Sequence, residues 1–107
     1  MSTVSTHVLD AVSGRPAGGV AVTLTDARAE VLATAVTDDD GRVRALGDDL
    51  PAGTYRVHFD TGSYFAAIEV AAFYPEVVIA FEITDDARHF HVPLLLSPYA
   101  YSTYRGS

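Results

Sequence analysis

Hydrophobic and polar residues alternate along most of this chain, and turn-forming residues interrupt the alternation at short intervals. Tyr55, Val57 and Phe59, for example, alternate with Arg56 and His58. Because successive side chains of a strand point to opposite faces, this segment is predicted to be a strand with one apolar and one hydrated face. The same pattern recurs along the sequence and predicts many short antiparallel strands.

About eight strands are expected, separated by clusters of Gly, Pro, Asp and Ser that favour tight turns. The turn signals are clearest at Ser13 to Pro16 and at Asp38 to Gly41. The predicted strands cover about Val4 to Val12, Val20 to Thr25, Val31 to Thr37, Arg42 to Leu46, Tyr55 to Phe59, Val77 to Ile83, Arg88 to Leu96 and Tyr101 to Arg105.

One segment departs from the alternation. Between about Ser63 and Ala72, the residues Phe65, Ile68 and Ala72 recur at helical spacing, and Pro75 follows them. This spacing predicts one short helix. The chain as a whole is therefore predicted to be an all-β protein, a β-sandwich with a single short helix.

The length adds a constraint on how this sandwich is stabilised. The chain has 107 residues, which predicts one domain over residues 1–107. A chain this short buries only roughly two-thirds of the surface that its unfolded form exposes. We therefore expect oligomerisation to contribute to stability.

Charge and composition exclude several classes of partner. Fourteen Asp and Glu oppose seven Lys and Arg, so the net charge is −7 at pH 7. Such a chain lacks the basic patch that nucleic acids and anionic membranes require. No apolar run exceeds five residues, and the first ten residues do not form a signal-peptide pattern, so a cytoplasmic protein is expected. The absence of cysteine excludes disulfides, thiolate catalysis and Cys-ligated metals.

Histidine is the main candidate for chemistry, since its unperturbed pKa of about 6.5 allows proton exchange near neutrality. His89 and His91 are two positions apart in a predicted strand, so both point to one face, roughly 6–7 Å apart along the chain. Three interpretations are open at this point: two half-exposed surface histidines, a catalytic imidazole, or a zinc site that includes His7.

Other candidates are ambiguous in the same way. His7 lies in the middle of the first predicted strand, where a hydrogen-bonded structural histidine is the alternative to a functional one. His58 lies opposite the apolar face of its strand and is expected to face solvent. Arg42 and Arg44 follow a predicted turn and share one face. Because the protein is acidic overall, an anionic ligand would need one of its few arginines.

The C-terminal segment is unusually aromatic, with three tyrosines among the six residues from Tyr99 to Tyr104. Chain ends are ordinarily polar and frayed. A run of Tyr and Thr suits a final edge strand whose aromatic side chains cover the sheet, or a strand that meets another surface.

Taken together, these segments resemble the transthyretin-like 5-hydroxyisourate hydrolases, enzymes of urate breakdown. The run from His89 to Ser107 is similar to the most specific motif of that family almost residue for residue. Ser5 to Asp10, Gly14 to Ala17 and Asp38 to Val43 are similar to its other signatures. The ending Tyr-Arg-Gly-Ser distinguishes these hydrolases from the thyroid-hormone carriers of the same fold. A minor departure is Ala100, where many members have glycine.

The resemblance implies both a fold and a site. The fold is a sandwich of two four-stranded sheets, assembled as a homotetramer with sites in a channel between dimers. The implied catalytic residues are His7, Arg42, His91 and Ser107, and the implied substrate-binding residues in the same cleft are Tyr104 and Arg105. No metal or other cofactor is implied, and the substrate is the small molecule 5-hydroxyisourate. The alternatives are a carrier-like binding protein without turnover and a zinc hydrolase that uses His7, His89 and His91.

Overall fold

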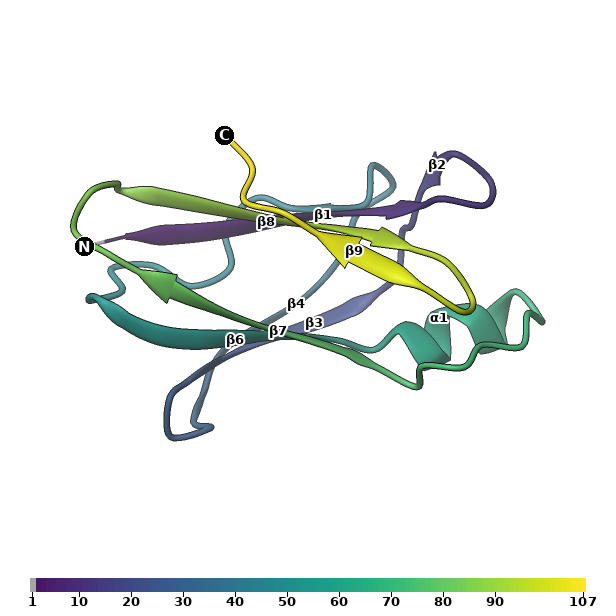
Figure 1. The fold of residues 1–107 in the computed structure, drawn as a ribbon, viewed down its shortest axis with the longest axis horizontal. Coiled ribbons are helices and arrows are strands. Elements are labelled where there is room, and N and C mark those ends of the chain that lie inside the picture. Colours follow the sequence, from purple (N-terminus) through teal and green to yellow (C-terminus); the bar gives the residue numbers. More distant parts are fainter. Residues whose placement is uncertain (1) are drawn as a thin grey trace.

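The computed structural model describes residues 2–107, whose strands form two facing sheets with a short helix at one end (Figure 1). In chain order the elements are β1 (Thr3–Asp10), β2 (Arg15–Pro16), β3 (Ala21–Asp26), β4 (Val31–Val36), β5 (Arg42–Val43), β6 (Gly53–Phe59), α1 (Thr61–Ala67), β7 (Val77–Ile83), β8 (His89–Leu96) and β9 (Tyr101–Thr103). The predicted all-β sandwich with one short helix is confirmed.

The strands are divided between a five-stranded and a four-stranded sheet. The first has the order β2-β1-β8-β9, with β5 also paired to β1, and the second has the order β4-β3-β6-β7. The extra strand in the first sheet is β2, whose residues the sequence assigned to a turn. Leu9 pairs with Pro16 and Asp10 with Arg15, so this turn closes a very short hairpin.

The pairing of β1 with β8 differs from the antiparallel arrangement expected. These strands run parallel, in a register from Thr3 opposite His89 to Asp10 opposite Leu96. Antiparallel neighbours can be joined by a tight hairpin, whereas parallel neighbours need a long connection. Here the connection between β1 and β8 includes the whole second sheet, so no local turn signal could reveal the pairing.

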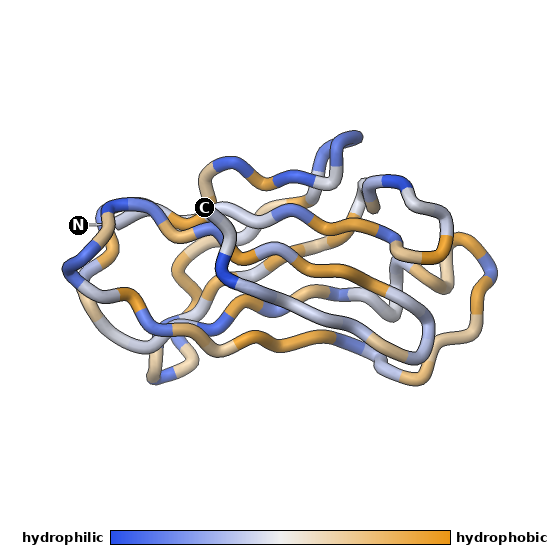
Figure 2. Tube along the Cα trace, turned by 45° about the horizontal axis from the view of Figure 1, so that its top comes forward, coloured by the Kyte–Doolittle hydropathy of each residue, from blue (hydrophilic) through white to orange (hydrophobic). Residues whose placement is uncertain are grey.

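The core lies between the two sheets and follows the predicted alternation. On β6, the side chains of Tyr55, Val57 and Phe59 are buried, while Arg56 is exposed. Figure 2 shows hydrophobic positions concentrated along the strands and hydrophilic positions at the turns. Each sheet therefore has an inner apolar face, and alternate residues on its other face are free to carry chemistry.

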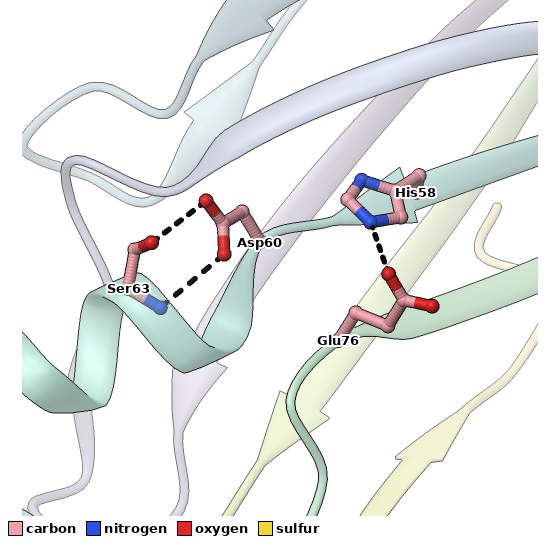
Figure 3. A network of polar contacts seen from close by, with 4 residues as sticks. All are labelled: His58, Asp60, Ser63 and Glu76. Carbon is pink, nitrogen blue, oxygen red and sulfur yellow. Dashed lines mark hydrogen bonds and ion pairs between the residues drawn. The ribbon is translucent and has the colours of Figure 1, made fainter.

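The helix α1 begins and ends earlier than predicted. The carboxylate of Asp60 accepts hydrogen bonds from the backbone N–H (3.2 Å) and the hydroxyl (2.8 Å) of Ser63, which caps the helix N-terminus (Figure 3). Glu69 adopts a positive φ of 57°, which stops the helical path. Phe65 is buried in the core. Within residues 2–107, no helix is long and apolar enough to cross a membrane.

His58 lies on the outer face of β6, as predicted, but it has a specific partner. Its Nε2 lies 2.9 Å from the Oε1 of Glu76 (Figure 3). Both side chains are more than one-third exposed, so this pair contributes little to stability. His58 is on the sheet opposite the candidate site and provides a matched control for the other histidines.

Candidate active site

A polar cleft of about 270 Å³ opens on the outer face of the five-stranded sheet. Phe90 and Val92 of β8 are buried, so the alternate residues His89 and His91 face outward. The cleft is lined by Ser5, Thr6, Arg42, Val43, Arg44, His89, His91 and Ser107. The fold thus brings together Arg42, His91 and Ser107, which the sequence predicted from three separate segments.

Two strands place a row of hydroxyl and imidazole groups at this cleft. Ser5 lies opposite His91 in the parallel register of β1 and β8. Its Oγ is 2.7 Å from Nδ1 of His91 and 2.8 Å from Nε2 of His89. The Oγ1 of Thr3 is 2.6 Å from Nδ1 of His89. His89 and His91 are therefore linked through Ser5 and are not independent surface histidines.

The turn before β5 places Arg42. The carboxylate of Asp38 accepts hydrogen bonds from the backbone N–H groups of Asp40 and Arg42, both at 2.9 Å. The bond from Arg42 is the main reason that the pKa of Asp38 is lowered. Gly41 has a φ of 75°, and a Cβ there would lie 2.3 Å from the carbonyl oxygen of Val8. Only glycine therefore fits this turn, which fixes the start of β5 against β1.

His7 lies beside the cleft and not on its wall. It is opposite Arg42 in the antiparallel pairing of β1 with β5. Its Nε2 is 2.9 Å from the backbone carbonyl oxygen of Asp40. Because a carbonyl only accepts, Nε2 of His7 carries the hydrogen, and Nδ1 is the free acceptor of the neutral ring. The hydrogen bond to Asp40 thus gives His7 a structural role and leaves its Nδ1 available for a functional one.

The C-terminal segment reaches the cleft beside His91 of β8. The strand predicted to extend to Arg105 ends at Thr103, and the chain then leaves the sheet on its outer side (Figure 1). The backbone N–H of Gly106 donates to the carbonyl oxygen of His91 at 2.9 Å. A Cβ at Gly106 would lie 2.4 Å from Cδ2 of His91. This close approach requires glycine and places Ser107 in the cleft.

The electrostatic surroundings of His91 favour its neutral form. Burial is the largest cause that lowers the pKa of His91, followed by the electrostatic effects of Arg42, His7 and His89. A hydrogen bond with the backbone of Ser5 acts in the opposite direction and is the smallest contribution. A neutral imidazole at neutral pH can accept a proton.

Tyr104 and Arg105 line a second, neighbouring cavity of about 310 Å³, formed by β7, β8 and β9. His91 is common to both cavities. The guanidinium of Arg105 lies 4.8 Å from the centre of the Phe90 ring. Within one chain, Tyr104 and Arg105 are thus separated from Arg42 and Ser107, and their role in substrate binding stays a prediction.

The sequence pattern did not single out Ser5 or Thr3, and it gave His89 a role only in the zinc alternative. Ser5 and His7 share one face of β1 because they are two positions apart. This alternation is the signal that could have found Ser5. Its contact with His89 and His91, however, depends on the long-range pairing of β1 with β8.

The geometry does not favour the three-histidine zinc alternative. Both ring nitrogens of His89 and Nδ1 of His91 already lie within hydrogen-bond distance of hydroxyl groups. His7 is engaged by the carbonyl of Asp40. Across residues 2–107, no three or more His, Cys, Asp or Glu side chains are grouped so that they could hold a metal ion.

Comparison with known proteins agrees with this fold. The chain is 47% identical over 109 residues to a 5-hydroxyisourate hydrolase of Salmonella dublin, covering 97% of this chain and 80% of the relative. It is 46% identical to the 5-hydroxyisourate hydrolase of Caulobacter vibrioides, with 100% of both chains covered.

Solved structures give the same result. The 5-hydroxyisourate hydrolase of Klebsiella pneumoniae matches with a TM-score of 0.92 and 42% identity, covering 100% of this chain and 94% of that one. Transthyretin from Sparus aurata matches with a TM-score of 0.89 and 34% identity, covering 96% of this chain and 95% of that one. The fold alone therefore does not separate the hydrolase from transthyretin.

The architecture and the cleft define a two-sheet β-sandwich with a histidine and arginine site on the outer face of one sheet. Residues 4–106 match the HIUase/Transthyretin family. The chain belongs to this family.

Proposed function

We propose that this protein hydrolyses 5-hydroxyisourate to 2-oxo-4-hydroxy-4-carboxy-5-ureidoimidazoline in the breakdown of urate. The observation that carries the proposal is the meeting of Arg42, His91 and Ser107, from three distant segments, in one polar cleft. Curated relatives at 46–47% identity carry the name of this hydrolase. The reaction needs water as nucleophile and a residue that takes up its proton.

His91 is suited to act on that water. Its Nδ1 is engaged by Ser5, which leaves Nε2 as the nitrogen available to the cleft. Its lowered pKa keeps the ring neutral at neutral pH. Proton transfer by a positioned imidazole contributes typically 10²–10⁴-fold to the rate. We assign general-base action to His91, while His7 orients the substrate or takes part in proton transfer.

Arg42 supplies fixed positive charge to the same cleft. Attack of water on a carbonyl of the substrate develops negative charge on its oxygen, and a positioned guanidinium stabilises that charge. The turn at Asp38 and Gly41 fixes the backbone of Arg42 beside the cleft before the substrate arrives. Ser107, which also lines the cleft, contributes a hydroxyl that can accept or relay protons.

The second candidate function is binding without turnover, as in the carriers of the same fold. The transthyretin of Sparus aurata has 34% identity to this chain and almost the same fold. A binding site for an apolar ligand is expected to be lined mainly by hydrophobic groups. The cleft here is lined mainly by Ser, Thr, Arg and His, which favours polar chemistry.

The deciding experiment adds purified protein to freshly generated 5-hydroxyisourate and follows the loss of its ultraviolet absorbance. We expect the wild-type protein to accelerate this loss well beyond spontaneous decay. His58→Gln should give the same acceleration, and His91→Gln should give little. Decay at the spontaneous rate with folded wild-type protein would favour the carrier alternative.

We also propose a homotetramer with sites between dimers, supported by the outward-facing cleft and by the exposed aromatic side chains Phe73, Tyr99 and Tyr104.

A cytoplasmic location and a single domain over residues 1–107 stay predictions of the sequence. Cell fractionation checks the location. Calorimetry checks the single domain, for which one cooperative unfolding transition is expected.

A further inference from the structure

Ser5 lies within hydrogen-bond distance of two imidazole rings at once, those of His91 and His89. Its Oγ lies 2.7 Å from Nδ1 of His91 and 2.8 Å from Nε2 of His89. The side-by-side strands β1 and β8 supply all three residues (Figure 1). Ser5 is only 8% exposed, so bulk water does not compete freely for these bonds.

We propose that Ser5 is a positioning residue that couples His91 to His89, so that a proton taken up by His91 in the cleft is passed on to His89. The inference rests on the proposed function, because it assumes that His91 is the general base. It adds Ser5 as the link and His89 as the final proton acceptor.

The number of hydrogens in this chain of bonds supports the coupling. A serine hydroxyl has one hydrogen to donate, whereas Ser5 contacts two ring nitrogens. When the hydroxyl donates to one nitrogen, the other nitrogen must donate to Oγ for both bonds to form. The tautomers of His89 and His91 are therefore set together and not independently.

One of the two neutral arrangements leaves His91 ready to act as a base. In it, Nδ1–H of His91 donates to Oγ of Ser5, and the Ser5 hydroxyl donates to Nε2 of His89. Nδ1–H of His89 then donates to Oγ1 of Thr3, which is 2.6 Å away. Every donor in the chain meets an acceptor, and Nε2 of His91 is left with a lone pair for the cleft.

Each proton moved in this transfer has a donor and an acceptor among the named groups. The attacking water forms a bond to the substrate carbonyl carbon and loses a proton to Nε2 of His91. The Nδ1 proton of His91 moves to Oγ of Ser5, while the Ser5 hydroxyl proton moves to Nε2 of His89. Ser5 is neutral before and after, and the positive charge ends on His89. The reverse transfer lets Nε2 of His91 protonate the leaving ring nitrogen as its bond to carbon breaks.

The surroundings make His89 the better place for the charge. His91 is half-buried, whereas His89 is exposed. Burial and nearby positive charge both disfavour a protonated imidazole. The charged or titratable groups around His91 are Arg42 and Arg44 of the β5 segment, His7 of β1 and His89 of β8. The two arginines carry fixed positive charge, which disfavours a proton on His91.

The test combines kinetics with ¹⁵N NMR of the histidine rings in the full-length protein. The variants are Ser5→Ala, Ser5→Thr, which keeps the hydroxyl, and His89→Gln, which keeps a hydrogen-bonding group but cannot take up a proton. His58→Gln is the matched control on the opposite sheet. We expect Ser5→Ala and His89→Gln to lower kcat on the order of tenfold to a hundredfold, less than full loss of a general base.

KM should change less than twofold in Ser5→Ala and His89→Gln. Ser5→Thr should recover most of kcat. The acid limb of the pH profile of kcat should shift in His89→Gln. In the NMR spectra, His91 should carry its hydrogen on Nδ1 in wild type and lose that preference in Ser5→Ala. Its titration should change in His89→Gln and not in His58→Gln. If Ser5→Ala does not fold, His89→Gln and Ser5→Thr supply the same comparison.

Unchanged kcat and pH profile in His89→Gln, or a His91 titration that does not respond to His89, would overturn the coupling. Wild-type protein without hydrolytic activity would instead refute the proposed function. The NMR measurement needs no substrate, so it separates the two failures.

Discussion

At the scale of single residues, the local environment of His91 sets the pH range of the site. Burial, Arg42, His7 and His89 together lower its pKa below the ordinary value of about 6.5. The folded state therefore disfavours the protonated ring. As the pH falls below 6.5, the unfolded chain takes up a proton on His91 more readily than the folded chain, so the stability that the neutral His91 contributes is progressively lost.

We predict that kcat/KM falls on the acid side with a midpoint below pH 6.5, since only the neutral ring accepts the proton from water. NMR titration of the His91 ring should give the same midpoint. Arg42→Gln should raise the pKa of His91, because it removes a neighbouring positive charge. A wild-type midpoint above 6.5 would contradict this account of the site.

We also predict hydrolysis without a metal ion. The nitrogens of His89 and Nδ1 of His91 are engaged by hydroxyl groups, which leaves no preformed ligand set among these residues. Exhaustive dialysis against EDTA should leave the rate unchanged. Loss of activity that Zn²⁺ restores would instead support a zinc site built from His7, His89 and His91.

At the scale of secondary structure, local pattern was sufficient for some elements and insufficient for others. The alternation from Tyr55 to Phe59 predicted β6 and its buried face correctly, because each residue's environment follows from its position in one strand. The parallel pairing of β1 with β8 could not be predicted, since it joins residues more than eighty positions apart. The contact of Ser5 with His89 and His91 depends on that pairing.

The C-terminal segment shows the same limit. Its family motif pointed to Ser107, whereas the strand pattern from Tyr101 to Arg105 predicted a longer strand than the one observed. Beyond Thr103 the chain follows a single bridge from Gly106 to His91 and not a continuous ladder. The close approach of Gly106 to the His91 ring determines this path, and no periodic signal encodes it.

We predict that a few residues added after Ser107 abolish most of the activity and leave the fold intact. Ser107 lines the cleft, so residues added after it would occupy the site. We expect kcat/KM to fall a hundredfold or more, on the order of 2.7 kcal/mol of transition-state stabilisation. Circular dichroism should be unchanged, because the buried core positions of the sheet end at Leu96. A folded, extended and fully active enzyme would remove Ser107 from the site.

At the scale of the whole molecule, the exposed surface favours the proposed homotetramer. β7 and β9 are edge strands of the two sheets, and unpaired edges favour association. Near these edges, Phe73 is 70% exposed and Tyr104 is 59% exposed. Phe73 packs edge-on against Tyr74, which in turn packs against Tyr101, so the aromatic surface is continuous across the two sheets.

We predict that this aromatic surface is buried in a homotetramer. Light scattering at low micromolar concentration should give about four times the mass of one chain. Phe73→Glu should reduce the mass, because a charge in a desolvated interface without a partner is costly. Val31→Glu is the matched control, since Val31 is 60% exposed on β4, at the opposite edge of the four-stranded sheet, and should leave the tetramer intact. A wild-type monomer with full activity would show that the site is complete within one chain.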